Sequence, residues 1–462
     1  MLFKNVAIRH RRIHFVGIGG VGMSGLAEIL LNLGYEVSGS DMQHSTTTKR
    51  LSSIGIQIFE GHNKKNVVGT DAVVVSSAIP TNNSERRAAR ESQIPIIERG
   101  ELLAELMRLQ YGIAIAGSHG KTTTTSIAAS ILQTAKMDPT VIVGGRVDAL
   151  GSNAKLGNSD LLLVESDESD GSFLKLAPIM AVLTSIDAEH LDHYGSLENV
   201  RKSFLEFANK VPFYGSVIAS SDDPQIRHIL PHIKRRVRTY GITSDADLTA
   251  SKIEYSHLAS QFELCYQGKN IGAFQVRGAG QHDVQNAMAS VLIGLELELA
   301  VDSIREGLFA FSGVDRRFQV RGTSSNITVV DDYAHHPTEI RATLAAARNC
   351  NFANIHVIFQ PHRHTRTNTL LLELAACFED CDRLYVVDIY GAGEQPIGGV
   401  DSIRLVEEIK VAGHTGATYC SSMQDACTTA IEKVTPGDAL ITLGAGDVWQ
   451  AGEQLLSLLG ER

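Results

Sequence analysis

Short apolar runs alternate with helix-length segments along the whole 462-residue chain, and this alternation most constrains its fold. Runs of four to six residues are too short for buried helices, and they suit strands covered on both faces, as in parallel sheets. The amphipathic stretches between them, such as Leu26–Leu33, Glu339–Ala347 and Leu370–Phe378, are predicted helices. The βαβα order therefore predicts an α/β fold. The predicted strands are Ile13–Val16, Ala72–Val75, Ile113–Ala116, Leu161–Val164, Ala181–Ile186, Ile327–Val330, Ile355–Phe359, Leu384–Val387 and Ala439–Leu443.

The length predicts about three domains, at roughly 150 residues each. One boundary is expected near residue 108, where the helix-like segment Gly100–Leu109 ends before a new strand at Ile113. A second is expected near Gly313–Arg317, before a strand-first unit that opens at Phe318. The predicted domains are 1–108, 109–315 and 316–462, with a small β appendage of the central domain at residues 240–280, where Phe262–Tyr266 and Ala273–Val276 are short strands.

Composition excludes several classes of protein. A net charge of −10 argues against a general nucleic-acid binder, because phosphate binding needs a basic face. The basic stretch 234–238 contains no interleaved aromatic residue and is interpreted as solvated surface. No apolar run approaches the ~20 residues of a membrane helix. The six cysteines are scattered, and no second pair at zinc-ligand spacing accompanies Cys377 and Cys381, so free thiols in a reducing cytoplasm are expected.

A first glycine-rich loop, Gly17-Ile18-Gly19-Gly20-Val21-Gly22, matches G-x-G-x-x-G between a predicted strand and a helix. Glycines there allow a tight turn and bring the helix N-terminus close to a pyrophosphate. Asp41 ends the next predicted strand, near the place of a ribose-binding carboxylate. The residues leave three interpretations open: a nicotinamide or flavin dinucleotide, another dinucleotide-like ligand, or a structural turn.

A second loop, Gly117-Ser118-His119-Gly120-Lys121-Thr122, follows the predicted strand Ile113–Ala116 and precedes a predicted helix, Thr123–Gln133. Its Gly-Lys-Thr end is that of a P-loop, in which backbone N–H groups cradle phosphates and the Lys reaches the terminal ones. Ile115 stands where the complete motif has its first Gly. The alternative is a chance Gly-Lys-Thr in a surface loop.

Acidic residues follow two neighbouring predicted strands. Glu165, Asp167, Glu168 and Asp170 come after Leu161–Val164, and Glu165, nearest the strand, is the candidate Mg²⁺ ligand. His190 follows the next strand among further acids and is a candidate ligand of a second metal. The alternative for the acids is a solvated loop or a helix cap.

Two more polar clusters follow strands in the last third of the chain. They are Asp331–Pro337 and Gln360–Arg366, and ligands of open α/β sheets bind at such strand ends. Arg363 and Arg366, three residues apart beside histidines, suit a doubly anionic group. The alternative is an ordinary basic helix start.

Together these segments resemble the Mur ligases, in the right order and over essentially the whole chain. The resemblance implies an N-terminal Rossmann-like domain for a UDP-sugar, a central P-loop-type ATPase domain, and a C-terminal Rossmann-like domain for an amino acid. The segments that carry it are His14–Gly25, Ser40-Asp41, Val75–Pro80, Gly117–Thr123, Val164–Asp170, Asp331–Glu339, Gln360–Arg363 and Leu443–Asp447.

The resemblance further implies an ATP-dependent ligase of peptidoglycan precursor synthesis. It would join L-alanine to the lactyl carboxylate of UDP-N-acetylmuramate through an acyl phosphate. The implied cofactors are ATP and Mg²⁺, the metal as two ions for which Mn²⁺ can substitute. The implied partners are small molecules alone, with no nucleic acid and no membrane insertion, and the oligomeric state is left open.

The family's site residues carry over by position. Lys121, Glu165, His190, Arg317 and Asp332 are implied to be catalytic, with Thr122, Glu165 and His190 at the metals. The implied ATP site comprises Gly117, Ser118, His119, Gly120, Lys121, Thr122, Thr123, His282, Asn286 and Arg316. The implied UDP-sugar site comprises Gly19, Gly20, Gly22, Met23, Ser24, Ser40, Asp41, Ser76 and Ser77, and the implied amino-acid site His335, Arg363 and Arg366.

Asp283 departs from the family pattern, which usually has Asn at this position. An ionised carboxylate only accepts hydrogen bonds and adds a negative charge. Asp283 also lies about 100° around a helix from the face that His282 and Asn286 share. We expect it to pair with a basic group at the rim of the site and not with ATP.

Two other classes of protein compete with the ligase. A nicotinamide-dependent dehydrogenase would explain the first glycine loop but leave the second loop and the Glu165 segment without a role. A non-enzymatic P-loop switch would bind or hydrolyse nucleotide without any UDP-sugar.

Overall fold

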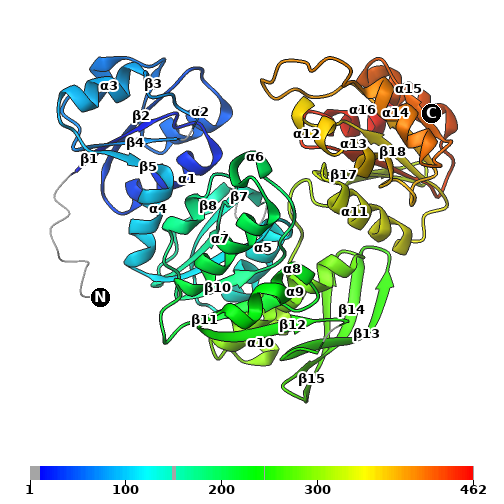
Figure 1. The fold of residues 1–462 in the computed structure, drawn as a ribbon, viewed down its shortest axis with the longest axis horizontal. Helices are drawn as coiled ribbons and strands as arrows, with labels where there is room; N and C mark the ends of the chain where they lie inside the picture. The colour runs from blue at the N-terminus through cyan, green and yellow to red at the C-terminus, as the bar shows by residue number, and fades with distance from the viewer. Residues whose placement is uncertain (1–10, 77, 148–151, 244, 461–462) are drawn as a thin grey trace. The chain divides into compact units, whose positions relative to one another are not determined.

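Three mainly parallel sheets with flanking helices make up the fold, which we describe from a computed structural model (Figure 1). The structure describes residues 11–76, 78–147, 152–243 and 245–460. All nine predicted strands are strands, so the predicted α/β class is confirmed.

The first sheet is Rossmann-like, with the strand order β3-β2-β1-β4-β5 and every neighbouring pair parallel. Alternation along the strands explains why both faces are covered: Phe15 and Val74 lie in one apolar cluster, whereas Val16, Val73 and Val75 lie in another. The strands are β1 (Arg12–Val16), β2 (Glu36–Asp41), β3 (Gln57–Glu60), β4 (Ala72–Val75) and β5 (Ile96–Glu98), and the helices α1 (Val21–Asn32), α2 (Thr46–Ser53), α3 (Ser84–Glu91) and α4 (Arg99–Arg108).

The second sheet has ten strands in the order β15-β14-β13-β12-β11-β10-β6-β9-β7-β8. Its strands from β12 to β7 are parallel, and β8 is antiparallel to β7. The two strands predicted within residues 240–280 lie in β14 and β15, and β13 is a third strand there that was not predicted. The strands are β6 (Tyr111–Ala116), β7 (Thr140–Val147), β8 (Ser152–Lys155), β9 (Leu161–Glu165), β10 (Met180–Leu183), β11 (Ser216–Ser220), β12 (Arg236–Gly241), β13 (Leu248–Ser256), β14 (Ala259–Tyr266) and β15 (Lys269–Arg277).

The helices that accompany this second sheet are α5 (Lys121–Thr134), α6 (Leu191–Tyr194), α7 (Leu197–Asn209), α8 (Pro224–Ile229), α9 (Gln281–Glu296) and α10 (Val301–Phe309).

The third sheet has the order β16-β17-β21-β18-β19-β20, and only its edge pair β16–β17 is antiparallel. Val357 and Phe359 pack with one set of helices and Ile358 with the other, as alternation along a strand covered on both sides requires. The elements are β16 (Gln319–Ser324), β17 (Ile327–Asp332), α11 (Pro337–Asn349), β18 (Ile355–Phe359), α12 (His364–Thr369), α13 (Leu371–Ala375), β19 (Arg383–Val386), α14 (Ser402–Val411), β20 (Ala417–Tyr419), α15 (Met423–Lys433), β21 (Ala439–Leu443) and α16 (Trp449–Gly460).

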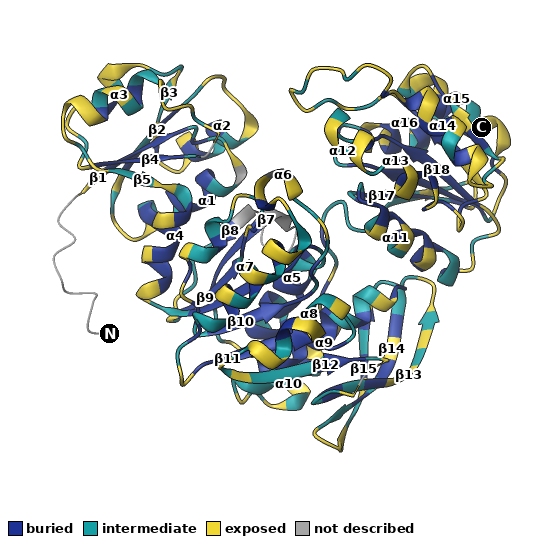
Figure 2. Cartoon of the chain, viewed as in Figure 1, coloured by how far each residue is buried: buried dark blue, intermediate teal, exposed yellow. Residues whose placement is uncertain are grey.

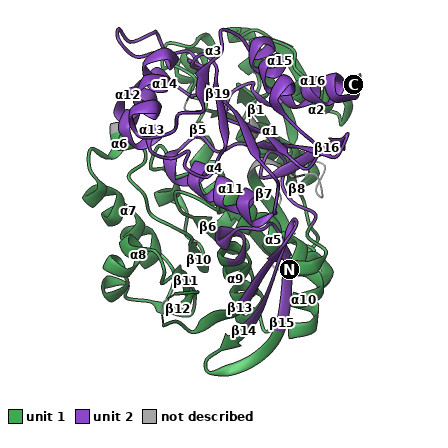
Figure 3. Ribbon diagram, turned by 90° about the vertical axis from the view of Figure 1, so that its right-hand side faces the viewer, with its two compact units in different colours: residues 1–251, 264–272, 285–311 green, residues 252–263, 273–284, 312–462 purple. Residues whose placement is uncertain are grey.

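Burial follows the sheets: their central strands are buried, and the helices are exposed along their outer faces (Figure 2). The chain packs as two compact units, shown in Figure 3. One contains residues 1–251, 264–272 and 285–311, and the other contains 252–263, 273–284 and 312–462. All six cysteines are free, as predicted. Among the described residues, we find no helix that is both long and apolar enough to span a bilayer.

Two predicted elements were too long. The predicted strand Ala181–Ile186 ends at Leu183, because Thr184 and Ser185 instead bond to the second glycine loop. The predicted helix Leu370–Phe378 is only Leu371–Ala375, because Leu370 has φ −108° and ψ 24° and separates α12 from α13. Hydrogen bonds set the end of β10 and backbone dihedral angles set the start of α13, and hydrophobic periodicity reports neither.

Candidate active site

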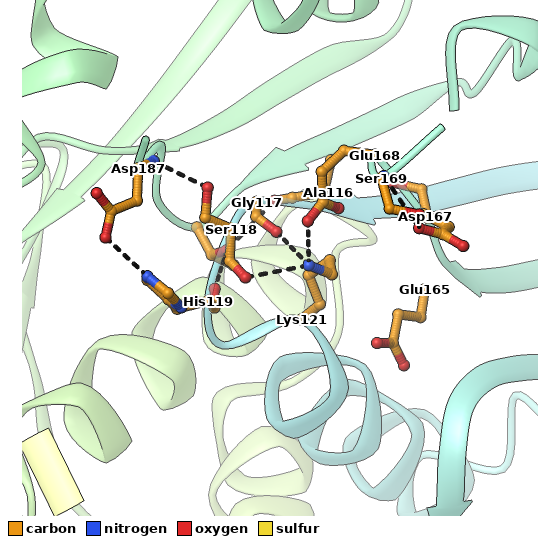
Figure 4. A network of polar contacts seen from close by, with 12 residues as sticks. Ala116, Gly117, Ser118, His119, Lys121, Glu165, Asp167, Glu168, Ser169 and Asp187 are labelled. Carbon is orange, nitrogen blue, oxygen red and sulfur yellow. Dashed lines mark hydrogen bonds and ion pairs between the residues drawn. The ribbon is translucent and has the colours of Figure 1, made fainter. Parts of the chain in front are cut away.

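The second glycine loop joins β6 to α5 and has the conformation that a phosphate loop needs (Figure 4). Gly117 has φ +149°, and a Cβ there would lie 2.0 Å from the Thr184 hydroxyl. Gly120 has φ +81°, and a Cβ there would lie 2.4 Å from Asn286 Oδ1. Both positions therefore need glycine, and the loop leads directly into the N-terminus of α5, where an anion is stabilised.

Lys121 lies in the centre of this loop. Its Nζ donates to the backbone oxygens of Gly117 (2.5 Å) and Ser118 (3.1 Å) and to Glu168 Oε1 (2.6 Å). Burial alone would lower the pKa of Lys121, but the nearby carboxylates, Glu168 foremost, outweigh burial and raise it. The side chain is therefore a partly buried cation held at the place where a P-loop lysine meets phosphate.

Two neighbouring groups could hold a cation. Thr122 Oγ1 donates to Glu165 Oε1 at 2.8 Å, which brings a hydroxyl and a carboxylate together at the start of α5. Separately, Glu168, Glu189 and His190 offer ligand atoms that all lie within 4.8 Å of one another. The family resemblance implies Glu165 and His190 at the metals, and among the described residues the group that meets this distance joins His190 to Glu168 and Glu189.

The loop after β10 braces the glycine loop from the other side. His119 Nε2 contacts Asp187 Oδ2 at 3.0 Å, and the Asp187 N–H donates to Ser118 Oγ at 2.8 Å. The Thr184 hydroxyl donates to the His119 carbonyl at 2.6 Å. Ser118 and His119 are thus held by β10's loop, and Thr123 lies in the first turn of α5.

His282, Asp283 and Asn286 all lie near the start of α9. Asn286 is buried beside the glycine loop and accepts a hydrogen bond from Thr124 Oγ1 at 3.2 Å. Asp283 is half-buried, and its Oδ2 accepts the Gly280 N–H at 3.0 Å, so it caps the helix. The His282 imidazole Nε2 lies 3.6 Å from Asp283 Oδ1. Burial raises the pKa of Asp283, although His282 opposes this. A basic partner was predicted, but it lies in the same helix turn.

The first glycine loop is held by the end of β2. Ser40 O accepts the Gly17 and Ile18 N–H groups, and Asp41 Oδ2 accepts the Gly19 N–H at 2.8 Å. Ser40 is fully buried, and its hydroxyl donates to Glu85 at 2.6 Å. Of the other predicted sugar-site residues, Gly20 and Gly22 lie at the start of α1. Met23 and Ser24 are buried, and their N–H groups donate to the Gly20 carbonyl. Ser76 follows β4, and Ser77 lies outside the described residues.

Glu85, at the start of α3, is the centre of a buried polar network that no linear motif revealed. Its carboxylate accepts Asn66 Nδ2 at 2.6 Å, contacts His62 Nδ1 at 3.1 Å and lies 3.6 Å from His14 Nε2. Burial would raise the pKa of Glu85, but the nearby His14 ring and the hydrogen bonds from Ser40 and Asn66 together lower it to about 2. The network ties β1, β2 and α3 together beneath the first glycine loop.

In the C-terminal part, two predicted site residues have structural partners. Arg316 donates to Asp331 Oδ2 (3.0 Å) and to the carbonyls of Gly444 (2.5 Å) and Gly446 (3.2 Å). Asp332 is buried and accepts the N–H groups of Phe318, at 2.6 Å, and Ala334, at 2.8 Å. Burial raises the pKa of Asp332, although Arg317 opposes this. Both residues hold the ends of β17 and β21 in place.

The other predicted residues of this part gather around Tyr333 and His362. The guanidinium groups of Arg316 and Arg317 lie 5.0 and 5.3 Å from the Tyr333 ring centroid. The rings of His335 and His362 are 5.6 Å apart, and Arg366 lies 3.1 Å from His362 Nδ1. Burial and these cations, with Arg363, lower the pKa of His362 to about 4. A neutral His362 imidazole thus accepts a hydrogen bond from Arg366.

Comparisons with known proteins assign the family. Family models match three consecutive parts of the chain: "Mur ligase family, catalytic domain" over residues 12–111, "Mur ligase middle domain" over 115–294, and "Mur ligase, glutamate ligase domain" over 316–446. The chain belongs to the Mur ligase family.

Relatives and solved structures agree with this assignment. This Mur ligase is 56% identical to the UDP-N-acetylmuramate–L-alanine ligase of Solibacter usitatus, over 99% of this chain and 97% of that protein. It is 52% identical to the enzyme of the same name from Koribacter versatilis, over 98% of each. The crystal structure of UDP-N-acetylmuramate-alanine ligase from Thermotoga maritima matches with a TM-score of 0.81 and 28% identity, over 98% of this chain and 100% of that one.

Several residues of this Mur ligase site were not singled out from the sequence. Glu168 and Glu189 lie among the acids that follow β9 and β10, but nothing in their spacing ranked them above their neighbours. Asp187 is 68 residues from the histidine it contacts. Three-residue and four-residue spacing reports helix faces, whereas contacts between neighbouring strand ends leave no local pattern.

Substituting Asp283, which departs from the family pattern, tests its role as a helix cap. We expect Asp283→Asn to change the Michaelis constant for ATP by less than about threefold, because Asn also accepts the Gly280 N–H. Asp283→Ala, which removes the cap, should lower the free energy of unfolding by about 1 kcal/mol. Steady-state kinetics and urea unfolding measure the two effects. A tenfold drop of the Michaelis constant in Asp283→Asn would mean that the carboxylate repels ATP.

Proposed function

We propose that this Mur ligase joins L-alanine to the lactyl carboxylate of UDP-N-acetylmuramate at the expense of ATP, which is the first amino-acid addition in peptidoglycan precursor synthesis. The observation that carries the proposal is the full-length similarity to enzymes of that activity, which reaches 48–56% identity over at least 98% of this chain in four relatives. The partly buried Lys121 in a loop of P-loop type supports the use of ATP.

The lactyl carboxylate must first be activated, because an amine does not displace oxide from a carboxylate in water. A carboxylate oxygen attacks the γ-phosphorus of ATP, the bond to the β,γ-bridging oxygen breaks, and ADP leaves, giving an acyl phosphate. The alanine amine, having lost a proton, then attacks the acyl carbon. The tetrahedral intermediate collapses with loss of inorganic phosphate and leaves the amide.

We assign the central site to the phosphoryl transfer. Lys121 would leave its carbonyl and Glu168 partners to neutralise the β- and γ-phosphates, while the loop N–H groups and the start of α5 orient them. His119 and Asn286 fix the loop from two sides. Arg317, which contacts Glu339 and the Tyr333 ring, is proposed for the transferring phosphoryl group.

The donor set fits the Mg²⁺ or Mn²⁺ ions that the family resemblance implies. Hard divalent cations prefer carboxylate and hydroxyl oxygens, which Thr122, Glu165, Glu168 and Glu189 supply, and Mn²⁺ also accepts the imidazole of His190. We propose Thr122 with Glu165 for one ion and His190 with these carboxylates for a second. Such ions supply charge stabilisation at the transferring group.

Metal dependence separates these ligands from the other acids. We expect Glu165→Gln and His190→Ala to raise the Mg²⁺ concentration for half-maximal rate by about 10-fold to 100-fold, because each removes a ligand. Initial rates over a Mg²⁺ titration measure this, with Asp170→Asn as the matched control on the same loop. Unchanged metal dependence in both variants would remove Glu165 and His190 from the metal site.

Each of the three predicted domains would bind one substrate. We propose residues 1–108 for the UDP-sugar, 109–315 for ATP, and 316–462 for alanine, with His335, Arg363 and Arg366 near its carboxylate. A bidentate guanidinium matches a carboxylate, and the cationic surroundings of His362 favour an anion. Since ATP and a nucleotide sugar are the substrates, we place the reaction in the cytoplasm.

Omitting each substrate in turn tests the proposal. We expect ADP release only when UDP-N-acetylmuramate, L-alanine, ATP and Mg²⁺ are all present. With oxygen-18 in the lactyl carboxylate, one labelled oxygen should appear in the released phosphate, since the acyl C–O bond breaks after transfer. Equal ATP hydrolysis without the UDP-sugar would refute the ligase and favour a P-loop switch.

A further inference from the structure

A basic stretch that the active site does not use lies beside an exposed aromatic pair. Phe213 and Tyr214 occupy the two central positions of a turn closed by the Gly215 N–H and the Pro212 carbonyl, at 3.0 Å. Lys234 N donates to Asn209 Oδ1 at 2.7 Å, and Arg235 Nε donates to the Val211 carbonyl. The fold thus supplies, from a loop some twenty residues away, the aromatic rings that the basic stretch lacks in sequence.

Both rings are exposed, and the turn geometry keeps them so. Phe213 is 90% exposed, more than any other large apolar side chain among the described residues, and Tyr214 is 64% exposed. The rings contact each other edge to face, with centroids 5.2 Å apart. A Cβ at Gly215 would lie 2.1 Å from the Ile179 carbonyl, so the turn is packed tightly on the start of β10.

Positive charge accompanies the rings in a chain whose net charge is −10. Within the part of the chain that the structure describes, Lys234 and Arg235 have no carboxylate within 4.0 Å. Arg236 pairs with Glu296 but keeps half of its side chain exposed. Lys210 pairs with Glu206 at 3.3 Å. We call Lys234, Arg235, Phe213 and Tyr214 the aromatic-basic patch.

The patch lies at the edge of the second sheet opposite the phosphate loop. Phe213 and Tyr214 precede β11, and Lys234 and Arg235 precede β12, whereas the phosphate loop follows the carboxyl end of β6. These strands are parallel and five or six residues long, which separates the two edges by about 17–20 Å. A partner on the patch would therefore leave the nucleotide-binding edge open.

We propose that the aromatic-basic patch docks this enzyme on an anionic lipid surface. Aromatic rings partition to the membrane–water interface, and each nearby Lys or Arg gains about fivefold in binding to anionic lipids. Two rings on a tight turn can enter the headgroup region without any change in the fold. The resulting attachment is peripheral, reversible and sensitive to salt.

Two other partners fit the patch less well. Single-stranded nucleic acid stacks successive bases on aromatic faces, but the edge-to-face pair does not offer two parallel faces. A stable protein interface covers about 800 Å² per partner, whereas two aromatic side chains bury roughly 150–250 Å² each. Shallow insertion into the membrane–water interface needs no more area than these two aromatic side chains offer.

Sedimentation with sucrose-loaded vesicles tests the proposal on the full-length protein. We expect binding to vesicles of phosphatidylglycerol and phosphatidylcholine, no binding to phosphatidylcholine alone, and loss of binding in about 1 M NaCl, where the Debye length is ~3 Å. Lys234→Glu with Arg235→Glu should lower the partition coefficient by about 25-fold or more. Phe213→Ser with Tyr214→Ser should lower it by about tenfold.

Matched variants distinguish the patch from general effects. Arg87→Glu with Arg90→Glu makes the same charge change on the exposed face of α3, and Val411→Ser removes another exposed apolar side chain, so both should bind vesicles like the wild type. Without vesicles, every variant should keep the wild-type ligase rate. Equal loss in patch and control variants, or no vesicle binding by the wild type, would overturn the proposal. Dimerisation or oligonucleotide binding that depends on Phe213, without vesicle binding, would also overturn it.

Discussion

Lys121→Ala should lower the ligase rate by about 10²–10³-fold while changing the affinity for the UDP-sugar only a few-fold. Removing one group that stabilises charge at the transferring phosphoryl typically has that cost. Lys121 Nζ lies between two loop carbonyls and Glu168, and the pKa of Lys121 is raised, so the protein holds a cation there that alanine cannot replace. The first glycine loop belongs to another sheet and does not contact this lysine.

A coupled assay of ADP release measures the rate, and calorimetric titration measures UDP-N-acetylmuramate binding. Lys202→Ala, which removes an exposed lysine of α7, is the control and should match the wild type. Because the variant leaves Glu168 buried without its cation, circular dichroism must first show that it folds. A folded Lys121→Ala protein that no longer binds the UDP-sugar would contradict our assignment of the two loops to different ligands.

Glu85→Gln should destabilise the first sheet by about 3 kcal/mol at pH 7. The pKa of Glu85 is lowered from the usual 4.5 to about 2, and each unit corresponds to about 1.4 kcal/mol. Because the folded state lowers this pKa, the stabilisation is present above pH 4.5. It is lost as the pH falls toward 2, where the carboxyl is protonated in both states. The difference between wild type and variant should therefore vanish in acid.

Amide hydrogen exchange of β1 and β2 measures this local stability within the intact chain. Glu91→Gln, on the same helix but exposed, is the matched control and should exchange like the wild type at every pH. Equal exchange in Glu85→Gln and Glu91→Gln at pH 7 would show that the network around Glu85 contributes nothing. A difference that persists unchanged at pH 2 would show a contribution that does not depend on charge.

The sequence was sufficient for the elements and for the glycine loops. Strands such as Ala72–Val75, Ile355–Phe359 and Ala439–Leu443 begin and end where the apolar runs do, because a strand buried on both faces must be apolar throughout. The second glycine loop was equally recognisable from its sequence. Its function depends on backbone geometry that glycines and the following helix impose within a few residues. Both signals are local.

Tertiary structure decided which distant side chains meet. Lys121 meets Glu168 across 47 residues, His119 meets Asp187 across 68, and Glu85 meets Ser40 across 45. The ends of neighbouring parallel strands bring such residues together, and the identity of the neighbour depends on sheet order, which apolar periodicity does not encode. The same holds for the aromatic-basic patch, since the sequence showed a basic run without rings and only the pairing of β11 with β12 placed Phe213 beside it. The sequence by itself thus determined the fold class, the central buried strands and the positions of the two glycine loops. Packing between sheet edges decided which charged side chains meet beside those loops.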